Sequence, residues 1–388
     1  MFIESQRVFQ RLENLIKKGQ TTYEDKIVPV DTSTYYREDI YEQELKMFHR
    51  LPILLDIASN FDDRKEHKIN FRTSHDYELP LIITKNSKGE FHAFPNICRH
   101  RGAPIEQELE GYKSSFMCPY HAWCYDVKGN VTYIPEAKAF QSNLSESLGS
   151  QYKIESTLGG LWLSGRPGQE NWKVLKDYFG PLASQLQIAA KNFPRHYKTT
   201  RSKYEFNWKF PIDAVLESYH ISTLHRETFK NVLHGNLGLH DNFGLHSRNL
   251  YPFKDLRGVT AVEKFEDLFQ CASMVYHLFP NSIFSIQPNF LLLMTTVPDS
   301  AESCTVINHY FIENEIVDQK SLDRAIALTQ IGVEEDYQLL QGVARNLKSQ
   351  HPVEFIFGGH EAMLSKFHQN IRLEITEKAR AGANIGSD

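Results

Sequence analysis

The 388-residue sequence contains no run of about 18 apolar residues, the length that a membrane-spanning helix requires. Its first 19 residues, MFIESQRVFQRLENLIKKG, lack the apolar core and small-residue cleavage site of a secretory signal. Their spacing of apolar residues instead predicts an amphipathic helix. We therefore expect a protein that does not cross a membrane and that is located in the cytoplasm.

Basic residues are not in excess. The 43 Lys and Arg residues are outnumbered by 48 Asp and Glu residues, which gives a formal net charge of −5, and they are scattered along the chain. A nucleic-acid-binding function therefore has no support. The sequence also contains no internal repeat and no glycine-rich dinucleotide-binding or flavin motif, so it shows no NAD(P)H site of its own.

Only five cysteines occur, an odd number that follows no disulfide pattern. Disulfide frameworks use even sets of cysteines at regular spacings, so none is expected here. Cys124, Cys271 and Cys304 are expected to be buried free thiols of a reducing compartment. The other two cysteines belong to the one short stretch with a clear chemical pattern.

That stretch contains two Cys–His pairs. Cys98 and His100 form a C-x-H pair, Cys118 and His121 form a C-x-x-H pair, and seventeen residues separate His100 from Cys118. Two thiolates and two imidazoles at this spacing can hold a [2Fe–2S] cluster, with the cysteines on one iron and the histidines on the other. Because imidazole is neutral and thiolate is anionic, this cluster is easier to reduce than one held by four cysteines.

Two alternatives exist for these pairs. Zinc accepts the same four side chains, although zinc fingers usually separate a C-x-x-C half from an H-x-x-x-H half, whereas both halves are mixed here. Two unrelated buried Cys–His neighbourhoods are the other alternative. Gly102, Pro104 and Pro119 favour turns, as expected of two loops that fold over a metal centre. We therefore favour the cluster.

The run C-R-H-R-G from Cys98, with C-P-Y-H-A-W from Cys118, resembles the Rieske motif of ring-hydroxylating, Rieske-type non-haem iron oxygenases. Ala122 stands where the family usually has Gly, and Cys124 where a small polar residue is common. Neither position is a ligand, so the cluster assignment is unaffected. The resemblance implies the catalytic alpha subunit of such an enzyme, with the four motif side chains as cluster ligands.

Turns and apolar runs predict an α+β fold with two domains. Residues 1–45 are expected to form a helical arm that packs on the catalytic domain, residues 46–165 a small all-β Rieske domain, and residues 166–388 the catalytic domain. The catalytic domain is expected to be helix-grip-like, with an antiparallel sheet and long C-terminal helices. Its strands are predicted at 200–208, 272–279, 282–287, 290–297 and 303–312, and its helices at 318–348 and 361–378.

A second candidate metal site lies in the segment 207–225, NWKFPIDAVLESYHISTLH. His220 and His225 are five residues apart, which places them roughly 140° apart on a straight helix. Both can bind one ion only if the helix bulges or ends between them, and Ser222 and Thr223 are plausible places. Two surface histidines are the alternative for this spacing alone. The E-x-x-H-x-x-x-x-H pattern after N-W-K is similar to the mononuclear-iron motif of the same family.

Two imidazoles and one carboxylate with open positions form the facial triad of non-haem Fe(II) oxygenases. The segment 333–345, VEEDYQLLQGVAR, resembles the E-D-x-x-L segment on the family's long C-terminal helix, which implies Asp336 as the third ligand. Glu335 is the second choice, because an error of one residue in register exchanges the two. The alternative is that these acids form a solvated helix face.

Glu217 lies three residues before His220. In the family, an acid at this position hydrogen-bonds a histidine of the mononuclear site and a Rieske histidine of the adjacent subunit. Carried over, the path runs from His121 through Glu217 to His220 and implies a head-to-tail homotrimer. The alternative for Glu217 is an acid on the helix surface.

Three further histidines, His234, His240 and His246, recur every six residues in a stretch rich in Gly and Asn. This spacing invites a metal interpretation. We favour instead a flexible loop near the mouth of the substrate pocket, since family members have mobile loops after the histidine pair.

The resemblance implies a terminal oxygenase component that uses O2 and electrons from NAD(P)H, delivered by a separate reductase with or without a ferredoxin. A separate beta subunit is found in some members. Hydroxylation, dihydroxylation or demethylation of an aromatic compound or a quaternary amine is expected at Fe(II). The E-D-x-x-L segment looks closer to relatives that act on quaternary amines.

Two functional alternatives remain from sequence. A Rieske electron carrier with an inactive second domain would share the first motif, but the intact set of His220, His225 and Asp336 argues against it. A structural zinc module would be colourless, whereas an iron–sulfur protein is red-brown.

Overall fold

The computed structural model describes residues 2–22, 28–61, 69–140, 152–166, 174–315, 318–351 and 353–383. The chain divides into two compact units, one formed by Met1–Met47 with Phe179–Asp388 and the other by Phe48–Tyr178. The domain boundaries expected from sequence, after residues 45 and 165, remain predictions. Among the described helices, none has both the length and the apolar character that crossing a membrane requires.

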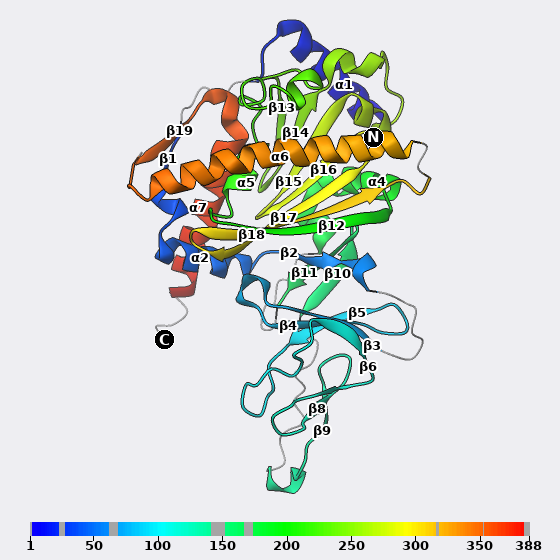
Figure 1. The fold of residues 1–388 in the computed structure, drawn as a ribbon, viewed down its shortest axis with the longest axis vertical. Coiled ribbons are helices and arrows are strands. Elements are labelled where there is room, and N and C mark those ends of the chain that lie inside the picture. The colour runs from blue at the N-terminus through cyan, green and yellow to red at the C-terminus, as the bar shows by residue number, and fades with distance from the viewer. Residues whose placement is uncertain are drawn as a thin grey trace. The chain divides into compact units, whose positions relative to one another are not determined.

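A seven-stranded antiparallel sheet forms the centre of the larger unit (Figure 1). From β13 to β18 each strand pairs with the next strand in the chain, and β12 pairs with β18 at the edge. The strands are β12 (Arg195–Tyr204), β13 (Leu239–Phe243), β14 (His246–Pro252), β15 (Ala272–Leu278), β16 (Ser282–Ile286), β17 (Leu291–Ser300) and β18 (Ser303–Ile312).

Both faces of the middle of this sheet are covered, because every residue of β15 and β16 is buried. Side chains alternate between the faces of a strand. Ser273 and Val275 of β15 therefore share the face on which α5 (Phe210–Val215) and α6 (Gln319–Leu347) lie, and all of these elements line one cavity. Tyr276 points to the opposite face, where its hydroxyl donates to Gln185 of α4 (Ala183–Asn192) at 2.9 Å.

The long helix α6 crosses the sheet in Figure 1. It begins after Asp318, whose carboxylate accepts hydrogen bonds from the backbone N–H groups of Lys320 and Ser321 and so caps the helix. The predicted helices at 318–348 and 361–378 are confirmed as α6 and α7 (Ala362–Ala383). The other helices are α1 (Phe2–Lys18), α2 (Glu38–Phe48) and α3 (Leu175–Phe179), and a two-stranded ribbon joins β1 (Val28–Asp31) to β19 (Glu354–Phe357).

The expectation of a flexible loop around His234, His240 and His246 is wrong for most of that stretch, because β13 and β14 form a hairpin there. Polar pairs stand directly opposite each other across the hairpin, His240 with Asn249 and Asp241 with Arg248. The His240 pair is hydrogen-bonded at 2.8 Å, and Arg248 binds Asp241 at 2.6 Å. These cross-strand pairs stabilise strands whose polar sequence is typical of a loop.

The smaller unit is built from three antiparallel sheets. The first has the order β5-β4-β3-β6, the second β10-β11-β2 and the third β7-β8-β9. Together with the helices of the larger unit, this confirms the predicted α+β class. The strands are β2 (Ile53–Ile57), β3 (Ile69–Ser74), β4 (Leu81–Lys85), β5 (Phe91–Pro95), β6 (Glu110–Lys113), β7 (Phe116–Met117), β8 (Cys124–Tyr125), β9 (Val131–Tyr133), β10 (Lys153–Thr157) and β11 (Gly160–Gly165).

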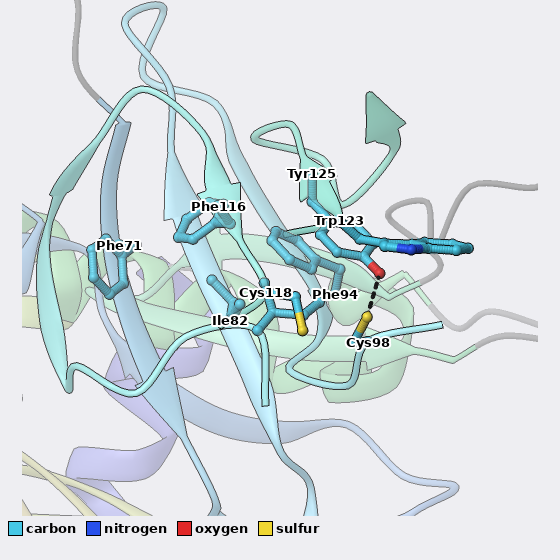
Figure 2. Packing of buried hydrophobic residues seen from close by; sticks show 9 residues of the cluster. Phe71, Ile82, Phe94, Cys98, Phe116, Cys118, Trp123 and Tyr125 are labelled. Atoms are coloured by element: carbon cyan, nitrogen blue, oxygen red, sulfur yellow. Dashed lines mark hydrogen bonds between the residues drawn. The ribbon is translucent and has the colours of Figure 1, made fainter. Parts of the chain in front are cut away.

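A compact core lies between the β5-β4-β3-β6 and β7-β8-β9 sheets and includes both Cys98 and Cys118 (Figure 2). Phe116 packs edge-on against Phe71 and Phe94, with ring centroids 5.4 and 5.6 Å apart. The two thiols therefore lie in an apolar environment with little water. The residues of this hydrophobic core are Phe71, Ile82, Phe94, Cys98, Ile105, Phe116, Cys118, Trp123 and Tyr125.

Candidate metal centres

Two loops of the smaller unit carry the Cys–His pairs in the same backbone conformation. The N–H of Cys98 bonds to the carbonyl of Ala103 at 2.8 Å, and the N–H of Cys118 bonds to the carbonyl of Trp123 at 2.8 Å. In each loop the residue four positions after the cysteine donates back to the cysteine carbonyl, at 2.8 Å from Gly102 and at 3.0 Å from Ala122. The two loops thus share one backbone hydrogen-bond pattern, although the histidine follows the cysteine by two residues in the first loop and by three in the second.

The left-handed backbone at this fourth position explains why glycine is favoured there. Gly102 has φ +75° and Ala122 has φ +57°. Glycine adopts such angles freely, whereas a side chain with a Cβ costs roughly 1–2 kcal/mol. Ala122 therefore introduces local strain in the second loop.

Among the four candidate cluster ligands, the two cysteines and the two histidines differ in exposure. Cys98 and Cys118 are buried, while His100 and His121 are partly exposed. The Nδ1 atoms of the two histidines lie 3.0 Å apart. Two buried thiols and two converging imidazole nitrogens are a donor set that fits a Rieske [2Fe–2S] cluster.

Two aromatic side chains support these ligands. The hydroxyl of Tyr125 donates to Cys98 Sγ at 3.1 Å, the bond drawn in Figure 2, and burial and this bond raise the pKa of Tyr125. The ring of Trp123 stacks on His100, with centroids 5.3 Å apart and ring planes within 3°. Hydrogen bonds to cluster sulfurs tune the potential of such centres, so Tyr125 is placed to tune a cluster held here, and the sequence pattern did not reveal it.

The larger unit holds the second candidate site, and its local conformation differs from the predicted one. The helix α5 ends at Val215, before His220, so the expectation that a helix bulges or ends between His220 and His225 is wrong. The reason is the Glu217 carboxylate, which accepts hydrogen bonds from the backbone N–H groups of Tyr219 and His220. A helix would need these N–H groups for its own ladder, so the side chain ends it.

The segment before α5 is fixed by a buried ion pair. Lys209 Nζ lies 2.6 Å from Glu44 of α2, and both side chains are 1% exposed. The other carboxylate oxygen of Glu44 accepts from the indole N–H of Trp208 at 2.7 Å. Asn207 donates to the carbonyl of Ala301 at 2.7 Å. The N-W-K sequence is therefore an anchor that positions the following segment, and Glu44 is a partner that sequence patterns did not identify.

His220, His225 and Asp336 converge on one point, with their ligand atoms all within 4.8 Å of one another. Asp336 Oδ1 lies 3.1 Å from His225 Nε2 and 3.6 Å from His220 Nε2. Both histidines therefore direct the same ring nitrogen toward the same carboxylate oxygen. Two imidazoles and one carboxylate, grouped beside a cavity, fit a mononuclear iron with open positions.

The remaining nitrogen of each histidine contacts a second carboxylate. His225 Nδ1 donates to Glu335 at 2.7 Å, and Glu335 also accepts from the hydroxyl of Thr228 at 2.7 Å. His220 Nδ1 donates to Glu217. Such bonds fix the tautomer and orientation of a metal-binding imidazole. Glu335 thus lies behind His225 and points away from the shared metal position, while Asp336 faces it.

These carboxylates give the site a negative potential. Burial lowers the pKa of His220, but the hydrogen bond and charge of Glu217 and the charge of Asp336 outweigh it, so the pKa is raised overall. Burial acts in the same way on His225, and Asp336 and Glu335 reverse its effect. A positive charge is therefore stabilised at this point, as binding a divalent cation requires.

A second hydrogen-bonded group joins Asp213 of α5 to Tyr35 and His368. Tyr35 donates to Asp213 at 2.7 Å, and His368 of α7 contacts the other oxygen of Asp213 at 2.9 Å. Tyr35 also stacks on Phe210, with ring centroids 4.5 Å apart. This group ties α5 to the N-terminal segment and to α7. Sequence patterns missed it because its members are far apart in the chain.

His220, His225 and Asp336 form part of the wall of a cavity of about 200 Å³. Its lining is mainly apolar and includes the rings of Phe229, Tyr251, Phe253 and Tyr337. This volume corresponds to roughly seven water molecules. The cavity can therefore hold a small organic molecule beside a metal.

Comparisons with known proteins cover both regions that carry a candidate site. Residues 192–377 match the family model of the ring hydroxylating alpha subunit (catalytic domain), and residues 58–147 match that of the Rieske [2Fe–2S] domain. These regions contain all eight candidate site residues, Cys98, His100, Cys118, His121, Glu217, His220, His225 and Asp336.

Individual relatives are distant. Choline monooxygenase from Beta vulgaris is 25% identical over 337 residues, which cover 84% of this chain and 72% of that protein. The anthranilate 1,2-dioxygenase large subunit of Acinetobacter baylyi is 30% identical over 162 residues, 40% of this chain and about a third (34%) of that subunit. Among solved structures, the quaternary ammonium Rieske monooxygenase CntA in complex with L-carnitine has a TM-score of 0.71 at 19% identity and covers 91% of this chain and 95% of its own, a likeness of fold.

Proposed function

Because the chain belongs to the Rieske-type non-haem iron oxygenases, we propose that it is a terminal oxygenase component that oxidises a small organic substrate with O2. The observation that carries this proposal is the convergence of His220, His225 and Asp336 at the wall of an apolar cavity. An electron carrier needs the cluster alone and has no use for this second donor set. The proposal includes a separate reductase that draws electrons from NAD(P)H.

Cys98, His100, Cys118 and His121 would hold a [2Fe–2S] cluster, which would supply one-electron storage, and His220, His225 and Asp336 would hold an iron, which would supply oxidation by O2. Around these groups the chain supplies position and proton control. Glu335 and Glu217 hold the two imidazoles with Nε2 directed at the metal position. Phe229 packs on His225 with ring centroids 4.7 Å apart and, with the other apolar lining, limits access of water.

Glu217 has a second proposed role, which is to connect His220 with His121 of an adjacent subunit in a head-to-tail homotrimer. An aromatic side chain stands beside each end of this path. Tyr120 precedes His121 and is 53% exposed, and Tyr219 precedes His220 and is 59% exposed. Large exposed rings next to the two centres are what an interface would cover on assembly.

The proposed substrate class includes aromatic compounds and quaternary amines, since relatives are named for choline and for anthranilate. The cavity suits either class because four aromatic rings line it. The free state of Cys124, Cys271 and Cys304 supports a reducing location such as the cytoplasm.

A single-turnover experiment tests the proposal. Protein loaded with iron and cluster is reduced chemically and exposed to ¹⁸O2 with choline, L-carnitine or anthranilate, and with related compounds. We expect the label to appear in a product, or formaldehyde to be released by demethylation, only when the second iron site is occupied. Oxidation of the cluster without any oxidised compound, at the same rate in Asp336→Ala, would favour the electron-carrier alternative.

A further inference from the structure

One end of the cavity is lined by two serine hydroxyls and the amide of Gln287. Gln287 Nε2 donates to Ser273 Oγ at 2.6 Å and to Ser285 Oγ at 2.9 Å. Each serine oxygen therefore already accepts a bond, while its own hydroxyl hydrogen remains available. Within the described part of the chain, no acceptor takes either hydrogen. Both serines and Gln287 line the cavity.

The same cavity is lined by one arginine, Arg257. Its guanidinium lies 5.6 Å from the centroid of the Phe253 ring. Arg257 is exposed, and the backbone N–H of Phe253, whose ring it faces, bonds to the carbonyl of Cys271 at 2.9 Å, two residues before Ser273. The Phe253 contact is the reason for placing Arg257 at this end of the cavity. Among the described residues, no carboxylate pairs with this guanidinium.

The backbone that carries Arg257 is strained. Asp255, Leu256 and Arg257 have φ values of 52°, 45° and 52°, which form a left-handed turn closed by Gly258 at +80°. Residues with a side chain pay roughly 1–2 kcal/mol each for this conformation, and consecutive left-handed residues are rare. Strain of this kind persists at functional sites, where it holds a side chain in a required position.

The charges of the cavity are separated. Its two carboxylates, Glu217 and Asp336, are both bound to histidines of the metal site. Elsewhere in the wall, Arg257 supplies only donors, while Ser273 and Ser285 each keep a hydroxyl hydrogen beside the Gln287 amide. A cationic headgroup would meet the Arg257 charge without a neighbouring carboxylate, whereas a carboxylate would find a charged fork and two hydroxyl donors.

The donor end lies away from the metal position. Met294 of β17 contacts Tyr337, the residue after Asp336, and Met294 pairs with Ile283. Ser285 and Gln287 lie two and four residues after Ile283. Gln287 is therefore about 13 Å farther along the strand than Ile283. On the facing helix, the lining runs from Ala325 to Asp336, about 16 Å along α6. A substrate bound at the donors can therefore extend toward the metal.

We propose that the cavity selects an organic acid whose carboxylate binds Arg257, Ser273 and Ser285 and whose apolar body reaches the metal position. This inference rests on the proposed function, because it names the substrate class of that site. It assigns specificity to Arg257 and to the two serines, and it favours anions over quaternary amines that lack a carboxylate.

Isothermal titration of the holoenzyme tests the charge preference. The probes are benzoate, phenylacetate, 3-phenylpropionate and 4-phenylbutyrate, each compared with its methyl ester and with the trimethylammonium compound of equal length. We expect at least one carboxylate to bind roughly tenfold or more tightly than both counterparts. Equal binding of acid and ester, tighter binding of the ammonium compound, or no binding of any acid at millimolar concentration would overturn the inference.

Variants then locate the preference. Arg257→Gln should remove the acid-over-ester ratio, and Ser285→Ala should reduce it. Lys254→Gln is the matched control, because Lys254 and Arg257 are both exposed in the same turn but only Arg257 lines the cavity. Circular dichroism and the visible spectrum of the cluster establish that each variant is folded. An unchanged ratio in Arg257→Gln would contradict the assignment.

Nitric oxide binding at Fe(II) separates this inference from the proposed function. Carboxylate selectivity without a nitrosyl signal would leave the donor site in place and remove the oxygenase. A nitrosyl signal with equal binding of acid and ester would support the oxygenase and remove the donor site.

Discussion

Glu335 and Asp336 are neighbours on α6 but contact opposite sides of His225. Asp336 lies 3.1 Å from Nε2 at the shared metal position, and Glu335 lies 2.7 Å from Nδ1 behind the ring. The sequence placed an acidic run on this helix, but a register difference of one residue exchanges the two roles. Only the direction of each side chain, about 100° apart around a helix, distinguishes them.

Substitution of these two acids should therefore have different effects. Asp336→Ala should lose the mononuclear iron and keep the cluster, since it removes a proposed ligand. Glu335→Ala should keep the site but weaken metal binding by about 10–100-fold, as is usual for a residue that orients a ligand. Iron analysis and the visible spectrum of the cluster measure both effects. Loss of the cluster in Asp336→Ala, or a larger metal loss in Glu335→Ala, would reverse the assignment.

Ala122 carries a prediction about the cluster loop. Its φ of +57° strains a residue with a Cβ but not glycine. Ala122→Gly should therefore raise the free energy of unfolding by about 0.5–1 kcal/mol. Gly102→Ala is the matched reverse change, because φ is +75° there and a new Cβ would meet no atom within 4 Å. Urea unfolding of the full chain, followed by cluster absorbance, measures both. Destabilisation by Ala122→Gly would refute the strain argument.

At the scale of elements, α6 carries Asp336, the proposed metal ligand, and also supports the segment after His225. A Cβ on Gly332 would lie 2.3 Å from the ring of Phe229, which packs against His225. Gly332 therefore allows the His225 segment to approach the helix closely. Gly342 lies on the same helix, and a Cβ there would meet nothing within 4 Å.

This contrast predicts opposite results for one type of substitution. Gly342→Ala should stabilise the protein by about 0.8–1 kcal/mol, the usual gain of alanine over glycine in a helix. Gly332→Ala should destabilise it and weaken iron binding, because Phe229 must move. Thermal unfolding and iron content are the two readouts. A gain in both variants would show that the Phe229 contact can relax without cost.

The elements that the sequence predicted best are those with strong hydrophobic patterns. The strands β15 to β18 and the helices α6 and α7 fall close to the predicted ranges, because their apolar residues are continuous or have a helical period. The end of α5 was not predictable in this way, because the Glu217 carboxylate competes for backbone N–H groups. The β13–β14 hairpin was missed because its stability comes from paired polar residues such as Asp241 and Arg248.

At the scale of the whole molecule, the proposed electron path joins two subunits. Within one chain, the Glu217 carboxylate is bound to His220. A homotrimer would have three times the chain mass of 44.9 kDa. Light scattering during size-exclusion chromatography measures this mass directly, and a stable monomer would contradict the proposal.

Mixed trimers test whether electrons cross between subunits. Cys98→Ser should abolish the cluster and keep the second site, while Asp336→Ala should do the opposite, so each variant alone should be inactive. Trimers reassembled from both should regain part of the activity, since an intact cluster then faces an intact iron site in the next subunit. Reassembled trimers without activity would place the path within one chain.

We expect Glu217→Gln to keep both metals bound but to stop turnover. The amide keeps the size of the side chain but loses its charge, so the link between His220 and the partner histidine is weakened. Iron content, the cluster spectrum and the rate of cluster reoxidation with O2 and substrate are the measurements. Normal turnover would exclude the bridging role of Glu217.

The central claim, that the convergence of His220, His225 and Asp336 is an iron site able to bind O2, is tested most directly by electron paramagnetic resonance. The iron-loaded, reduced protein is exposed to nitric oxide, which binds Fe(II) in place of O2. We predict a nitrosyl signal in the wild type that is absent in Asp336→Ala, with the Rieske signal retained in both. A Rieske signal without a nitrosyl signal in the iron-replete wild type would contradict the account.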